Sequence, residues 1–172
     1  MSARGTPATE ALRLAGIAHT VHEYEATPPG PGDASVRPGH GRTGYGRTAA
    51  AALGIGEDRI FKTLVADVDG RLVAAVVPVA GELDLKRVAH AFGGRRANMA
   101  EPAAAERATG YVVGGISPIA GRRALPTVVD VSARAYATIY VSAGRRGLQV
   151  ELAPDDLIRV TNARTAAVAR AG

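Results

Sequence analysis

Apolar and polar residues alternate along several short segments of the chain, and this period-two pattern predicts β-strands. The clearest case is residues 59–78, where two apolar stretches flank Asp69-Gly70, a pair favoured in type I′ hairpin turns. Because several neighbouring strands are joined by short turns, we expect a largely antiparallel sheet. Alternation or a short apolar run predicts further strands at 19–25, 111–113, 125–131, 136–142 and 148–152.

Apolar residues spaced three and four positions apart predict short helices between the strands. The first begins after Thr6 as the N-cap, has Pro7 in its first turn and ends at Gly16. A second carries Leu85, Val88, Ala89 and Phe92 on one face and ends at a glycine pair. Other helices are predicted at 47–54, at 101–110 and after Pro154.

Residues 26–46 are rich in glycine and proline and follow neither period, which predicts a flexible loop. The whole chain has 172 residues, the size of one ordinary domain. We therefore expect a single domain over residues 1–172. Its mixture of short helices and strands predicts an α+β fold around a curved, largely antiparallel sheet.

Composition narrows the possible chemistry. The chain has no cysteine, which excludes disulfides, a cysteine nucleophile and cysteine metal ligands. Its net charge of +5 permits an anionic partner such as RNA without requiring one. No apolar run approaches the roughly 20 residues of a membrane helix, and the N-terminus lacks the apolar segment of a signal peptide. We expect a soluble cytoplasmic protein.

The common catalytic and cofactor motifs are missing. The chain contains no GxxxxGK[ST] phosphate loop, no GxGxxG after a strand, no HExxH and no GxSxG, so we expect no cofactor. His19 and His22 lie three apart in a predicted strand and should point to opposite faces. Neither they nor His40 and His90 form a zinc-ligand pattern, so we expect no metal site.

Lys62 is unusual because 19 of the 21 basic residues are arginine, and only Lys62 and Lys86 are lysine. Period-two counting puts Lys62 on one strand face with Ile60 and Leu64, and Thr63 on the other. One interpretation is an edge-strand lysine that reaches the solvent. The arginine bias favours a second interpretation, in which the compact ammonium points into a cavity.

A second candidate is the sequence "GYVVGGISPIAG", in which an apolar run meets Gly114 and Gly115 before Pro118. Glycines allow a positive φ or a close approach of the backbone to a ligand. Such a turn can aim N–H groups at a carbonyl oxygen, although an ordinary sharp bend explains the same residues.

The triplet Gly-Arg-Arg occurs three times, at 94–96, 121–123 and 144–146, each where a turn is expected. If 125–131 and 136–142 pair as antiparallel neighbours, the second and third turns share one end of the sheet. The four arginines there, Arg122, Arg123, Arg145 and Arg146, would suit a phosphate backbone. The alternative is a set of solvated loops in an arginine-rich chain.

Four segments together resemble the YbaK/EbsC family, the Cys-tRNA(Pro) deacylases related to the editing domain of bacterial prolyl-tRNA synthetases. They are "FKTL" at 61–64, "VVPVAGELDLKRVAHAFGGRRANMAEP" at 76–102, "ERATGYVVGGISPIAGRRALPTVVD" at 106–130 and "ATIYVSAGRRGLQVEL" at 137–152. The motifs occur in the order and spacing of the family.

The resemblance implies a barrel-like sheet and a single domain that acts in trans on cysteine esterified to the terminal adenosine of tRNA. It implies Lys62 as the catalytic lysine, a pocket lined by the backbone of the GxxxP loop, and no protein nucleophile, so that the thiol of the substrate assists cleavage. Implied partners are the acceptor end of tRNA and prolyl-tRNA synthetase, with no membrane or DNA. The substrate-binding residues implied are Tyr24, Thr63, Gly114, Gly115, Ile116, Ser117, Pro118 and Ser142.

Two residues depart from the family pattern. Gln149 stands where relatives commonly have an acidic residue, and Thr48 where they often have glutamate. Such changes could alter which aminoacyl-tRNA is preferred, and they do not touch Lys62 or the GxxxP loop. Two alternative functions stay open: a deacylase for another mischarged residue, such as Ala-tRNA(Pro), and a non-catalytic module that binds tRNA or a synthetase.

Overall fold

The computed structural model describes residues 5–26 and 43–171. At its centre is a long hairpin of β2 (Ile60–Val68) and β3 (Arg71–Pro78), which pair antiparallel. The turn residues Asp69 and Gly70 have φ angles of 51° and 91°, as a type I′ turn requires, so the predicted hairpin is confirmed. The carboxylate of Asp67 accepts a hydrogen bond of 2.7 Å from the N–H of Gly70 and fixes this turn.

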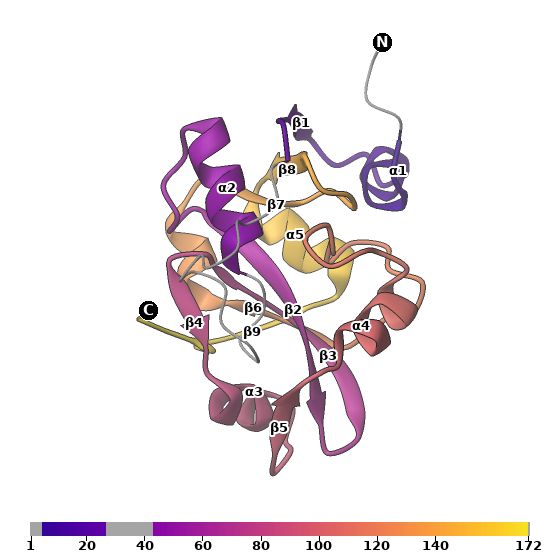
Figure 1. Cartoon of the computed structure of the whole chain (residues 1–172), viewed down its shortest axis with the longest axis vertical. Helices are drawn as coiled ribbons and strands as arrows, with labels where there is room; N and C mark the ends of the chain where they lie inside the picture. Colours follow the sequence, from indigo (N-terminus) through magenta and orange to yellow (C-terminus); the bar gives the residue numbers. More distant parts are fainter. Residues whose placement is uncertain (1–4, 27–42, 172) are drawn as a thin grey trace.

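The hairpin is extended on both edges into a sheet of eight strands (Figure 1). On the β2 side, β7 (Ile139–Ser142) joins in parallel, and β8 (Leu148–Leu152) and β1 (His19–Glu23) follow antiparallel. On the β3 side, β6 (Thr127–Asp130) and β9 (Arg164–Ala166) follow in parallel.

Three further strands complete the fold. The short strand β5 (Ala97–Met99) pairs antiparallel with the end of β2. Two others, β4 (Gly81–Leu83) and β10 (Ala169–Ala171), form a separate antiparallel pair. Most of the described strand pairs are antiparallel, and short helices lie around the sheet, so the expected α+β class is confirmed.

The helices begin and end where local signals place them. In α1 (Pro7–Leu14) the side chain of Thr6 caps the N–H of Thr9, and Gly16 follows the last turn with a φ of 67°. In α3 (Leu85–Ala91) the carboxylate of Asp84 is the cap. The other helices are α2 (Thr43–Leu53), α4 (Pro102–Thr109) and α5 (Pro154–Thr161).

The two faces of the sheet are covered by different helices. On the face that carries Ile60, Lys62 and Leu64, called here the Lys62 face, α2 packs through Ala49 and Ala50, and α3 packs through Val88. On the opposite face, α1, α4 and α5 enclose the larger apolar core, and their central side chains are Leu12, Ala105 and Leu157. Phe61 and Val65 of β2 belong to that core.

Several predicted boundaries are wrong. Residues 111–113 form a bend and a turn instead of a strand, and the N–H of Val113 donates to the carboxylate of Glu106 instead of to a neighbouring strand. The strands expected at 125–131 and 136–142 are shorter, with a 3₁₀ turn at Val131–Ala135 between them. Buried Asp130 holds that turn, since its carboxylate accepts from the N–H groups of Ser132, Val168 and Ala169.

Other corrections concern the glycine-rich segment and the strand order. Helix α2 begins at Thr43, inside the loop predicted at 26–46, and residues 27–42 lie outside the described residues. The predicted strand neighbours β6 and β7 do not pair, because β2 and β3 lie between them. The strands at 81–83, 97–99, 164–166 and 169–171 were not predicted. None of the helices in the described ranges has the length and hydropathy needed to cross a membrane.

Candidate active site

Four polar side chains form a row across the Lys62 face, one from each of four adjacent strands. Strand register places His22 opposite Gln149, and Gln149 opposite Ser142. The parallel pair of Ile60 with Tyr140 lies two residues earlier, which puts Lys62 of β2 beside Ser142 of β7. This row, His22–Gln149–Ser142–Lys62, is therefore assembled from residues far apart in the sequence.

Lys62 lies half-buried between two apolar clusters of the Lys62 face. Its Nζ donates a hydrogen bond of 3.0 Å to the carbonyl oxygen of Gly81, the first residue of β4. Burial lowers the pKa of Lys62 to about 8. The positive charge of Arg47 also lowers this pKa, whereas the negative charges of Glu82 and Glu57 raise it. At neutral pH the side chain is thus still mostly charged, but it releases its proton far more readily than an exposed lysine.

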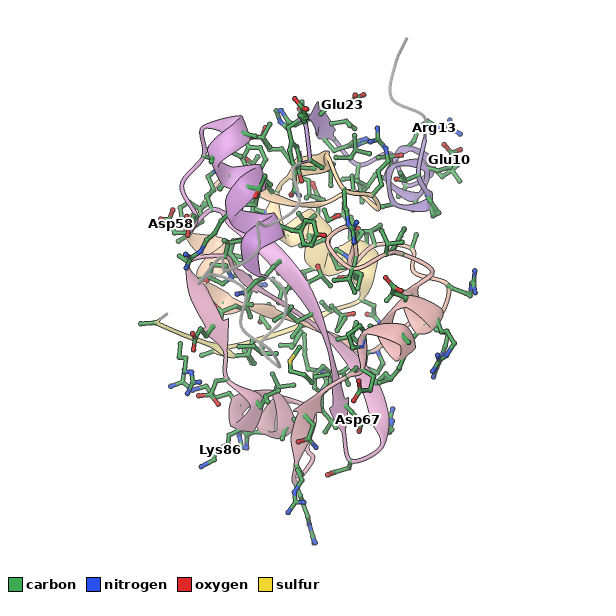
Figure 2. All side chains as sticks on the ribbon, viewed as in Figure 1. Glu10, Arg13, Glu23, Asp58, Asp67 and Lys86 are labelled. Carbon is green, nitrogen blue, oxygen red and sulfur yellow. The ribbon has the colours of Figure 1, made fainter. Side chains whose placement is uncertain are left out.

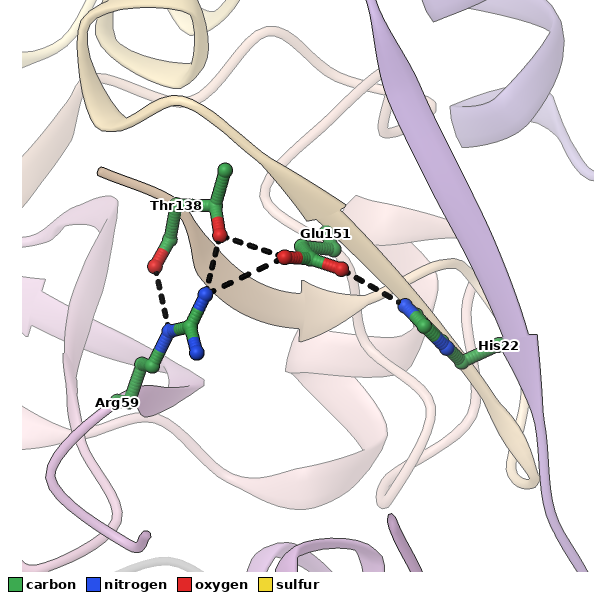
Figure 3. A network of polar contacts seen from close by, with 4 residues as sticks. All are labelled: His22, Arg59, Thr138 and Glu151. Carbon is green, nitrogen blue, oxygen red and sulfur yellow. Dashed lines mark hydrogen bonds and ion pairs between the residues drawn. The ribbon is translucent and has the colours of Figure 1, made fainter. Parts of the chain in front are cut away.

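A network of polar contacts lies directly beside the row (Figure 3). The carboxylate of Glu151 contacts Nε2 of His22 at 3.0 Å and Nη2 of Arg59 at 3.2 Å, and it accepts a 2.6 Å hydrogen bond from the hydroxyl of Thr138. The hydrogen bond from Thr138, followed by those from His22 and Tyr140, lowers the pKa of Glu151, and burial opposes this effect. The network ties together the strands or strand ends that surround the row.

The ring of Tyr140 packs against this network. The centroid of the Tyr140 ring lies 5.2 Å from the centroid of the His22 ring, and the two ring planes are tilted by 45°. The guanidinium of Arg59 lies over the face of the Tyr140 ring, 5.2 Å from its centroid. Tyr24, just beyond the end of β1, packs against the same cluster of Tyr140 and Ile60. Tyr24, Ser142 and Lys62 therefore share one face of the sheet.

The loop at 114–118 reaches this face through its glycines. A Cβ on Gly114, whose φ is 90°, would lie 2.9 Å from the ring of Tyr45 on α2. A Cβ on Gly115 would lie 2.7 Å from the backbone of Arg145. No larger side chain fits at either position without a shift of the surroundings, so the close approach requires the two glycines.

The rest of that loop lies on the opposite face. Ile116 packs in the core with Phe61 and Val65. Ser117 and Pro118, with Thr63, line a separate cavity of about 200 Å³. The Oγ of buried Ser117 accepts a hydrogen bond of 3.2 Å from the N–H of Ile119. The structure therefore brings Gly114 towards the Lys62 face but does not bring Thr63, Ser117 or Pro118 there.

The two arginine turns contact different segments: the 121–123 turn contacts the end of α4, and the 144–146 turn contacts residues 113–115. Arg122 and Arg123 donate their backbone N–H groups to Thr109 and Ala108 at the end of α4. Arg146 donates from Nε to the carbonyl of Val113 at 2.8 Å, and its guanidinium lies 4.7 Å from the centroid of the Tyr45 ring. With Arg145 these side chains are exposed, and within the described residues none pairs with a carboxylate.

Sequence reasoning missed two features of the site. It noted Gln149 only as a departure from the family pattern, whereas the side chain is only 6% exposed and its Oε1 has no hydrogen-bond partner among the described residues. The Glu151 network was missed as well, since pairing of β8 with both β1 and β7 is not visible in the sequence. His19 and His22 do point to opposite faces, as predicted, because His19 pairs with core residue Leu152. The described residues contain no group of three or more side chains suited to hold a metal ion.

Comparison with known proteins gives consistent matches. The family model described as "Aminoacyl-tRNA editing domain" matches residues 46–160. A protein of Enterococcus faecalis strain V583, named "Putative Cys-tRNA(Pro)/Cys-tRNA(Cys) deacylase EbsC", is 43% identical over 123 residues, which are 70% of this chain and 74% of that protein. The proline–tRNA ligase of Moorella thermoacetica is 32% identical over 95 residues, 55% of this chain and 16% of the ligase.

A solved structure has the same fold. It is described as "a putative trans-editing enzyme for prolyl tRNA synthetase" and superposes with a TM-score of 0.77 at 23% identity. The match covers 98% of this chain and 99% of that one, so β1 and β9, which lie outside the matched family segment, are part of the shared fold.

Proposed function

Because the chain belongs to the family of aminoacyl-tRNA editing domains, we propose that it is a deacylase that hydrolyses the ester of mischarged Cys-tRNA(Pro) in trans. The observation that carries this proposal is the position of Lys62, a half-buried cation on the same sheet face as Ser142 and Tyr24. Helix α2 packs on that face, and its Tyr45 lies against Gly114 of the GxxxP loop. We further propose that residues 1–172 form one editing domain.

Lys62 is proposed to stabilise the negative charge that develops on the ester carbonyl oxygen. A cation that is partly removed from water interacts more strongly with such a charge than an exposed one does. The ammonium has three N–H donors, and one of them is directed to the carbonyl of Gly81. The remaining donors are available to the ester, and the bond to Gly81 fixes the direction of the side chain.

The thiol of the cysteinyl ester is proposed to assist its own cleavage. An aminoacyl ester is already activated, so positioning and polarisation of its carbonyl can supply much of the acceleration. The chain has no cysteine, so the pocket offers no thiol that could exchange with that of the substrate. Proline and alanine carry no thiol, so their esters would be cleaved more slowly on chemical grounds alone.

The acceptor end of tRNA is the proposed macromolecular partner. The exposed arginines of the 121–123 and 144–146 turns flank the loop that reaches the Lys62 face, where they could contact phosphates close to the ester. Prolyl-tRNA synthetase is proposed as a second partner that could deliver mischarged tRNA, because part of a proline–tRNA ligase is similar to this chain.

A deacylation panel tests the proposal. The protein is incubated with tRNA(Pro) charged with cysteine, alanine, serine or proline, and release of the amino acid is measured. Cleavage of Cys-tRNA(Pro) well above the others is expected. Cleavage of Ala-tRNA(Pro) alone would assign a different substrate, and tRNA binding without cleavage of any ester would identify a non-catalytic module and overturn the proposal.

A further inference from the structure

Gln149 is a buried amide with an unused acceptor. It is 6% exposed, and within the described part of the chain no donor reaches its Oε1. Buried polar side chains are nearly always paired in native proteins, and an exception needs an explanation such as a role in binding or catalysis. The side chain lies on the Lys62 face, since Gln149 is opposite both His22 and Ser142 in the strand register.

The position of Gln149 relative to Lys62 suits the two ends of one nucleoside ester. The residues lie on β8 and β2, with β7 and Ser142 between them. Two strand spacings amount to about 10 Å. With the ester carbonyl at Lys62 and the ribose beside Ser142, the base of the terminal nucleotide would lie over Gln149.

We propose that Gln149 recognises the adenine base of the esterified terminal nucleotide. The inference rests on the proposed function and adds a residue that reads the base. Adenine presents the N6–H donor beside the N7 acceptor, and a glutamine amide matches this pair: Oε1 accepts from N6–H and Nε2 donates to N7. Guanine presents two acceptors at the same edge and would leave Oε1 facing the oxygen O6.

The neighbours of Gln149 supply aromatic surface for the base. The imidazole of His22 is held by Glu151 at 3.0 Å and by the ring of Tyr140, so its orientation is fixed, while about 30% of the side chain stays exposed. Tyr24 follows two residues later on the same face. Rings beside a base-reading amide are the arrangement that proteins use to stack a single-stranded base.

A carboxylate at this position could not make both contacts. An ionised Asp or Glu accepts from N6–H but has no hydrogen to donate to N7. The amide of Gln149 has both a donor and an acceptor, so it can make both contacts at once. The α-ammonium of the ester is a competing donor for Oε1, and it predicts no dependence on the base.

The test uses cysteinyl esters of adenosine, purine riboside, which lacks the N6 amine, and 7-deazaadenosine, which lacks N7. For the wild-type chain we expect kcat/KM to fall on the order of ten- to one-hundred-fold for each analogue, mainly through KM. Gln149→Met should cleave all three esters at similar rates, and Gln149→Glu should lose only the dependence on N7. Thr20→Val, a change on the exposed part of β1 one row away, should keep the full preference.

Equal cleavage of the three esters by the wild-type chain, or an adenosine preference that persists in folded Gln149→Met, would overturn the inference. Failure of the wild-type chain to cleave any ester would overturn the proposed function instead. In that case binding of adenosine and of purine riboside, followed by NMR at the side-chain amide of Gln149, decides the inference separately: tighter binding of adenosine supports it, and equal binding overturns it.

Discussion

The Nζ of Lys62 donates a 3.0 Å hydrogen bond to the carbonyl oxygen of Gly81, and this contact joins the central hairpin to the small β4–β10 pair. A surface lysine would exchange such a bond with water and contribute little. Here the bond fixes a partly desolvated cation whose pKa is lowered to about 8. The first two predictions follow from this arrangement.

Lys62→Ala should reduce deacylation of Cys-tRNA(Pro) by at least about 100-fold, because it removes the cation proposed to stabilise the developing oxyanion. The matched control is Lys86→Ala, which removes the other lysine of the chain. Lys86 is exposed on α3 and points away from the body of the protein (Figure 2). The deacylation rate of Lys86→Ala should equal that of the wild type. A folded Lys62→Ala protein with normal turnover would remove the main site assignment.

The rate should also depend on the charge of Lys62. A lysine is protonated below its pKa, so a required ammonium is present at pH 7 and is lost as the pH rises through about 8. Ionisation of the substrate thiol, with a pKa of about 8.5, acts in the opposite direction, so a bell-shaped profile of kcat/KM is expected. In Lys62→Arg the side chain stays charged. If Lys62→Arg retains activity, its kcat/KM should no longer fall at alkaline pH. An unchanged fall would show that another group causes it.

Exchange of sulfur for oxygen in the substrate tests thiol assistance. Ser-tRNA(Pro) should be cleaved far more slowly than Cys-tRNA(Pro), because a hydroxyl is much less ionised than a thiol near neutral pH. Single-turnover rates on the two esters give the comparison, and equal binding of both tRNAs is the control. Similar rates would point to attack by water under the control of protein groups.

Simultaneous change of Arg122, Arg123, Arg145 and Arg146 to Gln should weaken tRNA binding and flatten its salt dependence, because fewer counterions are released. Hydrolysis of cysteinyl-adenosine should survive, since that ester has no acceptor-stem phosphates. Binding with an unchanged salt slope would identify these turns as ordinary solvated loops. Loss of activity on the small ester would show that they shape the pocket, as the contact of Arg146 with Val113 and Tyr45 makes feasible.

Glu151→Gln should destabilise the domain by about 1–3 kcal/mol, because Arg59 and His22 lose their anionic partner. The pKa of Glu151 is lowered in the folded state, so its contribution is present above the unfolded value of 4.5 and is lost as the pH falls through the folded value. Urea unfolding between pH 3 and pH 7 checks this, since the difference from wild type should shrink at the acid end. A constant difference would assign the loss to packing.

Features set by neighbouring residues were predictable from the sequence, and features set by distant pairing were not. Asp69-Gly70 specifies its hairpin and Thr6 its helix start, because the interactions lie within a few residues. The face of Lys62 followed from period-two counting. The row from His22 to Lys62 did not, because it needs β8 between β1 and β7, and β7 beside β2. The β6–β7 pairing failed for the same reason: adjacent in sequence, these strands lie on either side of the hairpin.

Lys62 and Thr63 are consecutive residues that face different interiors of the protein, the lysine towards the candidate active site and the threonine towards the cavity lined by Ser117 and Pro118. A slip of β2 by one residue would exchange them, because side chains alternate along a strand. The ammonium would then enter the core beside Val76 and Val129, where an unpaired charge is costly. The lysine that the reaction is proposed to need therefore also destabilises any fold in which the central hairpin forms with its register shifted by one residue.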